Sequence, residues 1–485
     1  MRGGCGCFAS MREMRGTRSI ADLPGPRGLP LIGNLHQMGG PYEALGTIER
    51  WCDRYGPIFK FRMGVRVIVV VCDVDEINCI LRERPEGYRR VREIETGFAE
   101  LSFPGVFSVE GETWRRQRRL AVAALNSNHL HGHFHVVRTA TERLHRRLRD
   151  AARAGQVLDI CEELTSYSLD IVATLAFGHD LNTLERHSSE LQHHIEVAFK
   201  ALSFRCFFPI PYWRWVRLPA DRAMERSVIE LRLAVATFIE QARVRMRERP
   251  ELFDAPENFL EAMLAAQRQD NSFSDEEIVG NTFTLMIAGE DTTAHTLAWA
   301  CWLLAQRPDV QARCAREGEE LLGDDPLPAT SDLVARFRYV EAALRESIRL
   351  QSVSSGQVVQ PLSDTTICNT RAPAGTRVLL PTRRITRNAG GSEFDPERWL
   401  DERTAPDPKV FLSFGAGQRF CPGRNLAFLE SKSALAMITR NFEMELDPSA
   451  GPVREQFAFT MIPIGLRVRL RERAVTGVAT PSAAA

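Results

Sequence analysis

The segment Phe414-Gly415-Ala416-Gly417-Gln418-Arg419-Phe420-Cys421-Pro422-Gly423 puts one cysteine on a glycine-rich loop. Its three glycines permit positive φ and a close approach of the backbone to a flat ligand, and Pro422 stiffens the turn. A Cys421 thiolate held in this way, with backbone N–H groups directed at the sulfur, suits an axial ligand to haem iron. Arg419 is then placed to pair with a haem propionate through a charge-assisted hydrogen bond. The alternative is a glycine-rich surface turn with an uninvolved cysteine, and further motifs argue against it.

A second motif, Glu346-Ser347-Ile348-Arg349, falls within the helical pattern of residues 339–350. The spacing of three places both charged side chains on one helix face, where they can bind each other. Such pairs are common on surface helices, so this one gains weight from Phe394-Asp395-Pro396-Glu397-Arg398-Trp399 further along the chain.

A long apolar helix is predicted between Ser274 and Arg307. Ser274-Asp275-Glu276-Glu277 has the pattern of a capping box, and Pro308 ends the helix. The helix has roughly 32 residues, or about 48 Å at 1.5 Å per residue. Glu290 and Asp291 lie near its centre, where carboxylates would be costly in lipid. A helix through the middle of a globular protein is therefore favoured.

Together, these segments resemble the cytochrome P-450 family. Phe414–Gly423 matches its haem-binding signature, and Glu346–Arg349 matches its E-x-x-R pair. The segment 394–399 is similar to its meander motif. Trp114 and Arg118 fit its W-x-x-x-R haem-propionate contact and lie one helical turn apart. The proline-rich segment 23–34 resembles the beginning of the family's catalytic domain, and the matches keep the family's order from residue 23 to 472.

The resemblance implies a mainly α-helical fold with a small β-sheet region. Haem b would lie between the long central helix and the cysteine loop, with the Cys421 thiolate as its axial ligand. Glu346, Arg349 and Arg398 would form a structural lock behind that loop. The expected cofactor-binding residues are Trp114, Arg118, Ala288, Gly289, Phe414, Arg419, Cys421 and Gly423.

The hexapeptide Ala288-Gly289-Glu290-Asp291-Thr292-Thr293 resembles the family's oxygen-activation motif. Gly289 is expected to open space beside the haem. Asp291 and Thr292 are the predicted catalytic pair, because an acid and an alcohol can together relay protons from water to dioxygen. The hexapeptide alone could belong to a buried helix whose polar side chains are all hydrogen-bonded. This alternative does not explain why the hexapeptide occurs together with the cysteine loop.

The activity implied by the resemblance is that of a haem-dependent monooxygenase of the hydroxylase or epoxidase type. It would insert one oxygen atom from O2 into an apolar small molecule, with electrons from a separate donor: a ferredoxin with its reductase, or a flavodoxin. The alternatives are a haem-thiolate peroxygenase or isomerase, or a non-catalytic haem sensor. Neither needs the acid–alcohol pair, so the intact Asp291 and Thr292 argue against both.

The resemblance to the family also implies which residues line the substrate pocket of this chain. Its residues are Phe98, Leu101, Phe103, Phe107, Leu285, Met286, Val353, Phe459 and Thr460. Such a lining favours a mostly apolar ligand, such as a fatty acid, a terpenoid or a steroid-like compound. Two departures from the family stand out. Residues 351–356 replace prolines that are common after Leu350, and residues 387–393 form a short stretch before the meander motif.

Composition supports a globular protein, with 44% hydrophobic and 26% charged residues and a formal net charge of zero that gives no reason to expect nucleic acid. The resemblance assigns residues 23–475 to one catalytic domain, flanked by a disordered leader (1–22) and a flexible tail (476–485). Eleven cysteines without C-x-x-C spacing indicate a reducing, intracellular setting. The leader has neither the roughly 20 apolar residues of a bilayer span nor a signal peptide's apolar stretch. We therefore expect a cytoplasmic monomer without a membrane anchor.

Other helical patterns cover residues 42–55, 114–125, 136–154, 158–177, 191–201, 223–248, 259–269 and 425–441. Strand signals are few, at 58–63, 67–72, 377–380 and 466–470. One histidine cluster, His129, His131, His133 and His135, suggests a zinc site if helical. No carboxylate or cysteine lies nearby in sequence to orient the imidazoles, so a surface cluster is favoured.

Overall fold

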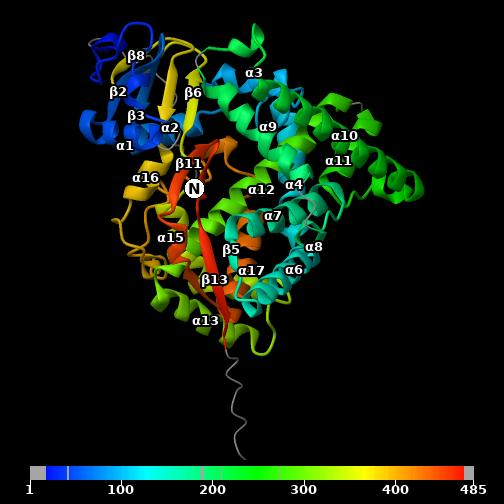
Figure 1. The fold of residues 1–485 in the computed structure, drawn as a ribbon. Coiled ribbons are helices and arrows are strands. Elements are labelled where there is room, and N and C mark those ends of the chain that lie inside the picture. The colour runs from blue at the N-terminus through cyan, green and yellow to red at the C-terminus, as the bar shows by residue number, and fades with distance from the viewer. Residues whose placement is uncertain (1–17, 41–42, 187–189, 209, 271, 474–485) are drawn as a thin grey trace, which may run out of the picture.

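The computed structural model describes residues 18–40, 43–186, 190–208, 210–270 and 272–473. Helices form most of the molecule, and the strands of its largest sheet gather with α1 and α2 at one side (Figure 1). Most of the predicted leader and all of the predicted tail lie outside the described residues. Residues 18–22, which the sequence assigned to the disordered leader, instead form a short strand and a 3-10 turn because Arg18 and Ser19 pair with Thr370 and Arg371.

The helices are α1 (Ala44–Tyr55), α2 (Val74–Arg82), α3 (Arg92–Glu100), α4 (Gly111–Ala124), α5 (Ser127–Gly132), α6 (Phe134–Arg153), α7 (Ile160–Phe177), α8 (Thr183–Arg186), α9 (Glu190–Phe207), α10 (Pro219–Glu248), α11 (Phe259–Asp270), α12 (Asp275–Ala305), α13 (Pro308–Leu322), α14 (Ser331–Arg336), α15 (Arg338–Leu350), α16 (Thr382–Asn388) and α17 (Arg424–Asn441). Each of the predicted helices is present, with ends shifted by a few residues. Helix α9 continues to Phe207, beyond its predicted end.

The strands are β1 (Arg18–Ser19), β2 (Ile58–Met63), β3 (Arg66–Val71), β4 (Tyr88–Arg90), β5 (Val157–Asp159), β6 (Gln357–Pro361), β7 (Thr365–Ile367), β8 (Thr370–Ala372), β9 (Arg377–Leu380), β10 (Phe442–Leu446), β11 (Arg454–Ala458), β12 (Thr460–Ile464) and β13 (Arg467–Glu472). The main sheet has the order β2-β3-β9-β6-β4, and the smaller sheets are β10-β13-β5, β1-β8-β7 and the hairpin β11-β12. All four predicted strands are present. The sequence missed the others, most of which are short.

Helix α12 runs through the middle of the molecule (Figure 1). It begins as predicted: Ser274 Oγ accepts from the Glu277 N–H at 3.1 Å, and the Ser274 N–H donates to Glu277 Oε2 at 3.0 Å. It packs most extensively on α7, where a Cβ added to Gly289 would lie 2.5 Å from Val172 Cγ2. Glycine at this position therefore allows the two helices to approach each other closely. The expectation that Gly289 also opens space beside the haem stays a prediction.

Two large hydrophobic clusters meet at α12. Residues from its second half, such as Leu297, join α6, α7 and α17, whereas Phe283 and Met286 from its first half join α9, α10 and α11. The helix is thus fixed by apolar packing along its length, and polar side chains at its centre are held in a rigid frame.

Candidate active site

Cys421 lies on the loop that leads directly into α17. Gly415 and Gly417 have φ of 72° and 68°, as predicted. A Cβ on Gly417 would lie 2.5 Å from Leu81 O, so this loop can approach α2 only with glycine here. The Cys421 N–H donates to Phe414 O at 2.9 Å, which closes the loop. The expectation of a positive φ at Gly423 is wrong: its φ is −83°, because Gly423 is the N-cap of α17.

The surroundings of the Cys421 sulfur combine burial with hydrogen-bond donors. Burial raises the pKa of the thiol, whereas the backbone N–H groups of Gly423 and Arg424 and the Arg118 guanidinium act in the opposite direction. These donors stabilise negative charge on the sulfur, and the thiolate is the form that binds a metal. The N–H groups directed at the sulfur agree with the sequence-based expectation.

Arg419 and the two α4 residues, Trp114 and Arg118, converge on this loop. The Arg419 guanidinium lies 4.0 Å from the centroid of the Trp114 ring. Its Nη2 donates to Val109 O at 3.1 Å and to Glu110 Oε2. Arg118 Nη2 donates to Phe420 O, next to Cys421. The sequence did not single out Glu110, because nothing near it in the chain marks it as a partner of Arg419.

Arg84 and Arg90 join Arg419 in a cluster of buried positive charge. Desolvation lowers the pKa of all three guanidinium groups, to about 9 for Arg419, and Glu110 is the carboxylate that opposes this effect at each of them. Five of their buried nitrogens have no hydrogen-bond partner among the described residues: Nε and Nη2 of Arg84, Nε of Arg90, and Nε and Nη1 of Arg419. Guanidinium groups stay charged in proteins, so this cluster needs anionic acceptors. The two propionates of a haem would supply them, and the residues present therefore fit that cofactor.

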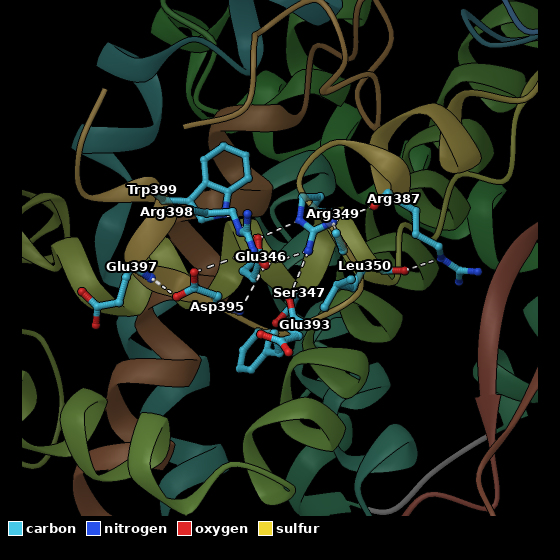
Figure 2. A network of polar contacts seen from close by, with 12 residues as sticks. Glu346, Ser347, Arg349, Leu350, Arg387, Glu393, Asp395, Glu397, Arg398 and Trp399 are labelled. Atoms are coloured by element: carbon cyan, nitrogen blue, oxygen red, sulfur yellow. Dashed lines mark hydrogen bonds and ion pairs between the residues drawn. The ribbon is translucent and has the colours of Figure 1, made fainter. Parts of the chain in front are cut away.

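Behind the cysteine loop, Glu346 binds two arginines (Figure 2). Arg349 donates Nη2 to Glu346 Oε1 and Nε to Oε2, both at 2.8 Å, and neither side chain has exposed surface. Arg398 Nε donates to Glu346 Oε1 at 2.9 Å, and Trp399 Nε1 donates to Oε2 at 2.8 Å. The Trp399 ring lies 5.3 Å from that of Phe411, just before the loop. The three residues predicted to form a lock therefore do meet.

The short stretch before the meander motif also contributes to this network. Arg349 Nη1 donates to Arg387 O at 2.6 Å and Gly391 O at 2.7 Å, and Nη2 donates to Glu393 O at 3.1 Å. The charge of Arg349 is thus surrounded by a carboxylate and three carbonyls. The shortened stretch is bound to α15 rather than detached from it.

The acid–alcohol pair lies at the centre of α12. The Thr292 hydroxyl donates to Ala288 O at 2.7 Å. Asp291 Oδ2 accepts from the Thr460 hydroxyl, and Asp291 Oδ1 lies 3.3 Å from His295 Nδ1. Ala288 is exposed and Thr292 half-buried in a helix whose neighbouring residues are mostly buried. One face of α12 therefore leaves Ala288 and Thr292 open to a ligand.

The predicted pocket residues divide into two groups. Phe98, Leu101, Phe103, Met286 and Thr460 are buried, with at most 5% exposure. Phe107, Leu285, Val353 and Phe459 are half-buried and keep surface for a ligand.

An aromatic chain links members of both groups. The Phe98 and Phe107 ring centroids are 5.5 Å apart, and Phe107 lies 5.9 Å from Phe459. Phe199 and Phe207 of α9 extend this chain to Phe459, at 5.2 and 5.6 Å. Nothing in the sequence indicated that Phe199 lies here, because Phe98, Phe107 and Phe459 are far from it along the chain.

The histidine cluster falls at the end of α5 and the beginning of α6. The His129 and His133 rings stack at 4.1 Å, and His131 Nδ1 lies 2.7 Å from Ser331 Oγ. Across the part of the chain that the structure describes, no three histidine, cysteine or acidic side chains come together in a way that could hold a metal ion. None of the helices in the described ranges has the length and apolar character needed to cross a membrane.

Comparison with known proteins identifies the class to which this fold and site correspond. The model of the Cytochrome P450 family matches residues 23–469, so the chain belongs to this family. It is 28% identical to the mitochondrial 25-hydroxyvitamin D-1 alpha hydroxylase of Mus musculus, over 92% of this chain and 91% of that protein. It is 26% identical to cytochrome P450 4e2 of Drosophila melanogaster, over 90% of this chain and 86% of that protein.

Among solved structures, the crystal structure of the cytochrome P450DA heme domain matches with a TM-score of 0.81 at 24% identity, covering 93% of this chain and 98% of that one. The mainly helical fold predicted from the sequence is thus confirmed. Membership of the family makes the protein a monooxygenase, an oxidoreductase that uses haem with a cysteine thiolate ligand.

Proposed function

We propose that Cys421 is the thiolate ligand and that the enzyme inserts one oxygen atom from O2 into an apolar small molecule, such as a fatty acid, a terpenoid or a steroid-like compound. The half-buried rings of Phe107 and Phe459, which contact each other, carry the substrate part of this proposal. Aromatic surface with few polar groups binds ligands chiefly by excluding water from apolar area. The half-buried Leu285 and Val353 extend the same kind of surface.

In this proposal the haem is held by residues from four parts of the chain. Cys421 would bind the iron, and the Gly423 and Arg424 N–H groups would stabilise charge on its sulfur. Arg84, Arg90 and Arg419 would bind the propionates through the N–H groups that have no partner among the described residues, and the Trp114 ring packs against Arg419. When bound, the haem supplies the activation of dioxygen, and a thiolate ligand favours O–O cleavage.

Asp291 and Thr292 are proposed to relay protons from water to dioxygen. The Thr292 hydroxyl donates its hydrogen bond to Ala288 O, which leaves the hydroxyl oxygen free to accept a hydrogen bond from water. The Asp291 carboxylate, on the adjacent residue, can accept a proton from solvent and pass it on. Glu346, Arg349 and Arg398 are assigned a structural role, because they contact one another and the backbone rather than the open face of α12.

Replacement of Thr292 by alanine tests this division of roles. We expect Thr292→Ala to keep haem and substrate binding but to divert electrons from NAD(P)H into hydrogen peroxide or water. Added peroxide should partly restore product. The measurement is product formed per NAD(P)H consumed, with Thr439→Val as a control, since the Thr439 hydroxyl donates within α17 to Leu435 O at 2.7 Å. Fully coupled turnover in Thr292→Ala would exclude the proton-relay role.

The substrate class can be tested by spectral titration of the haem with a fatty acid, a terpenoid and a steroid. Apolar ligands should shift the haem spectrum towards high spin, and Phe107→Ala should weaken the shift. If only small, highly charged molecules produced a shift, the apolar pocket would have to be abandoned.

We also propose that the electrons come from a separate ferredoxin with its reductase or from a flavodoxin, and that the enzyme is a cytoplasmic monomer. Reconstitution with each donor, light scattering and cell fractionation test these three points. One similar protein is named as mitochondrial, so fractionation must separate that compartment from the cytosol.

A further inference from the structure

The Asp291 carboxylate is contacted at both of its oxygens by side chains outside the acid–alcohol pair. The Thr460 hydroxyl donates to Oδ2. His295 Nδ1 lies 3.3 Å from Oδ1, and the same ring nitrogen lies 3.5 Å from Thr460 Oγ1. Asp291, His295 and Thr460 therefore form a closed triangle of polar contacts. No motif in the sequence pointed to His295, and Thr460 was expected only as a pocket residue.

Several backbone and side-chain contacts hold Thr460 in this position. Thr460 begins β12, directly after Phe459, whose φ of 72° makes the tight turn of the β11–β12 hairpin. Trp299 Nε1, two turns further along α12, donates to Met461 O at 2.9 Å. The Met461 N–H donates to Val353 O at 3.0 Å. The hairpin tip is thus bound to α12 and to residue 353, and the backbone at Thr460 cannot move away from Asp291 without breaking these bonds.

The contacts also indicate which ring nitrogen of His295 carries the proton. An ionised carboxylate only accepts hydrogen bonds, so Nδ1 must carry the proton for its contact with Asp291 Oδ1 to be attractive. Nε2 of a neutral imidazole is then the acceptor. Only 8% of the His295 side chain and 20% of the Asp291 side chain are exposed, so water competes little for this contact.

We infer that His295 and Thr460 are positioning residues that fix the Asp291 carboxylate beside Thr292 for proton delivery. The inference rests on the proposed function of Asp291 and Thr292. A free aspartate populates several rotamers, whereas one that is hydrogen-bonded at Oδ2 and contacted at Oδ1 is confined to the orientation that the helix and the hairpin tip define. His295 and Thr460 act through Asp291, and no proton needs to pass through the imidazole.

Paired substitutions separate this role from alternatives. His295→Leu removes the donor, whereas His295→Asn keeps an N–H close to the position of Nδ1 but cannot ionise. Thr460→Val removes the hydroxyl with little change of shape, and Thr460→Ser keeps it. We expect the Leu and Val variants to lose about tenfold in product formed per NAD(P)H consumed, because each loses a polar contact to the Asp291 carboxylate. The Asn and Ser variants should stay within about twofold of the wild type.

Two control variants show whether replacing any buried histidine or threonine lowers the product formed per NAD(P)H consumed. His145→Leu replaces a half-buried histidine whose ring lies 5.8 Å from Phe442, and Thr439→Val removes a buried hydroxyl on α17. Both should keep the wild-type coupling. If His295→Leu were as coupled as His145→Leu, or if His295→Asn failed to restore coupling, the positioning role would be overturned. The second result would instead indicate an imidazole that must ionise.

A second readout does not depend on turnover. In the diamagnetic ferrous carbon-monoxide form, 15N NMR of labelled histidine should show His295 with its proton on Nδ1, assigned by its disappearance in His295→Asn. Asp291→Ala, which removes both acceptor oxygens, should remove this tautomer preference. A proton on Nε2 in the wild type would overturn the inference. Failure of the proposed function would appear differently, as a wild-type protein without the red-shifted carbon-monoxide band.

Discussion

Replacing Glu346 by glutamine should destabilise the protein far more than the same change at an exposed ion pair. Glu346 accepts five hydrogen bonds within the buried network of Figure 2: two from Arg349, one each from Arg398 and Trp399, and one from the Asp395 N–H at 3.1 Å. Glutamine keeps one acceptor oxygen but turns an NH2 group towards at least two of these donors. It also leaves the charge of Arg349, which has no exposed surface, without its counter-ion.

The magnitude follows from the burial of the network. Removing one partner of a buried ion pair costs about 3–5 kcal/mol, because the remaining charge stays desolvated. The matched control is Glu112→Gln, since Glu112 and Arg115 have the same spacing of three and an N–O distance of 3.0 Å but are 73% and 41% exposed. An exposed pair of this kind contributes about 0–1 kcal/mol. The two variants should therefore differ by several kcal/mol in unfolding free energy.

The assay is urea unfolding of the holoenzyme, followed by tryptophan fluorescence and by haem absorbance. A lower midpoint at an unchanged slope reports lost stability. Because Trp399 connects Glu346 to Phe411 at the beginning of the cysteine loop, haem should also be released earlier in Glu346→Gln. If Glu346→Gln unfolded within about 1 kcal/mol of Glu112→Gln, the reasoning about the buried network would be refuted.

Two further predictions concern single positions. Gly417→Ala should lower haem retention and stability more than Gly451→Ala. Both glycines have positive φ (68° and 74°), but only a Cβ at 417 would meet another atom, Leu81 O at 2.5 Å. Equal losses of stability in thermal unfolding would show that the close approach of the loop to α2 is unimportant. Burial, with Asp291 and Glu196 nearby, raises the pKa of the Glu290 carboxyl well above its ordinary 4.5. The native state then keeps a proton that the unfolded chain releases, so this stabilising contribution is present at low pH and is lost as pH rises towards the native pKa. The unfolding free energy of the wild type minus that of Glu290→Gln should fall as the pH rises above the ordinary carboxyl pKa of 4.5, by at most about 1.4 kcal/mol per pH unit, and a constant difference would contradict the raised pKa.

Features set by neighbouring residues could be predicted from the sequence. The capping box at Ser274, the end of α12 before Pro308 and the positive φ of Gly415 and Gly417 depend on short-range chemistry that is visible in the chain. Most helices were found for the same reason, since their apolar periodicity is local. The short strands of three residues, such as β4 and β7, lack enough positions for an alternating pattern and were missed.

Contacts between distant segments could not be predicted in this way. Thr460 meets Asp291 across 169 positions of sequence, and its place depends on the hairpin tip and on Trp299. Arg84 and Arg90 join Arg419 only through folding, and no spacing in the chain marks them. Phe103 and Met286 were expected to line a pocket, but they are fully buried, with Phe103 stacked on Phe283 at 3.8 Å. Which apolar residues face a ligand and which fill the core is a property of packing rather than of residue type.

The assignment of Cys421 as the thiolate ligand is tested most directly by the absorbance spectrum of the reduced protein under carbon monoxide. The wild type should show the red-shifted Soret band of a haem-thiolate protein. Cys421→Ala should lose that band, and Cys314→Ala, which changes a buried cysteine on α13 away from the loop, should keep it. A red-shifted band that persists unchanged in Cys421→Ala would contradict the assignment.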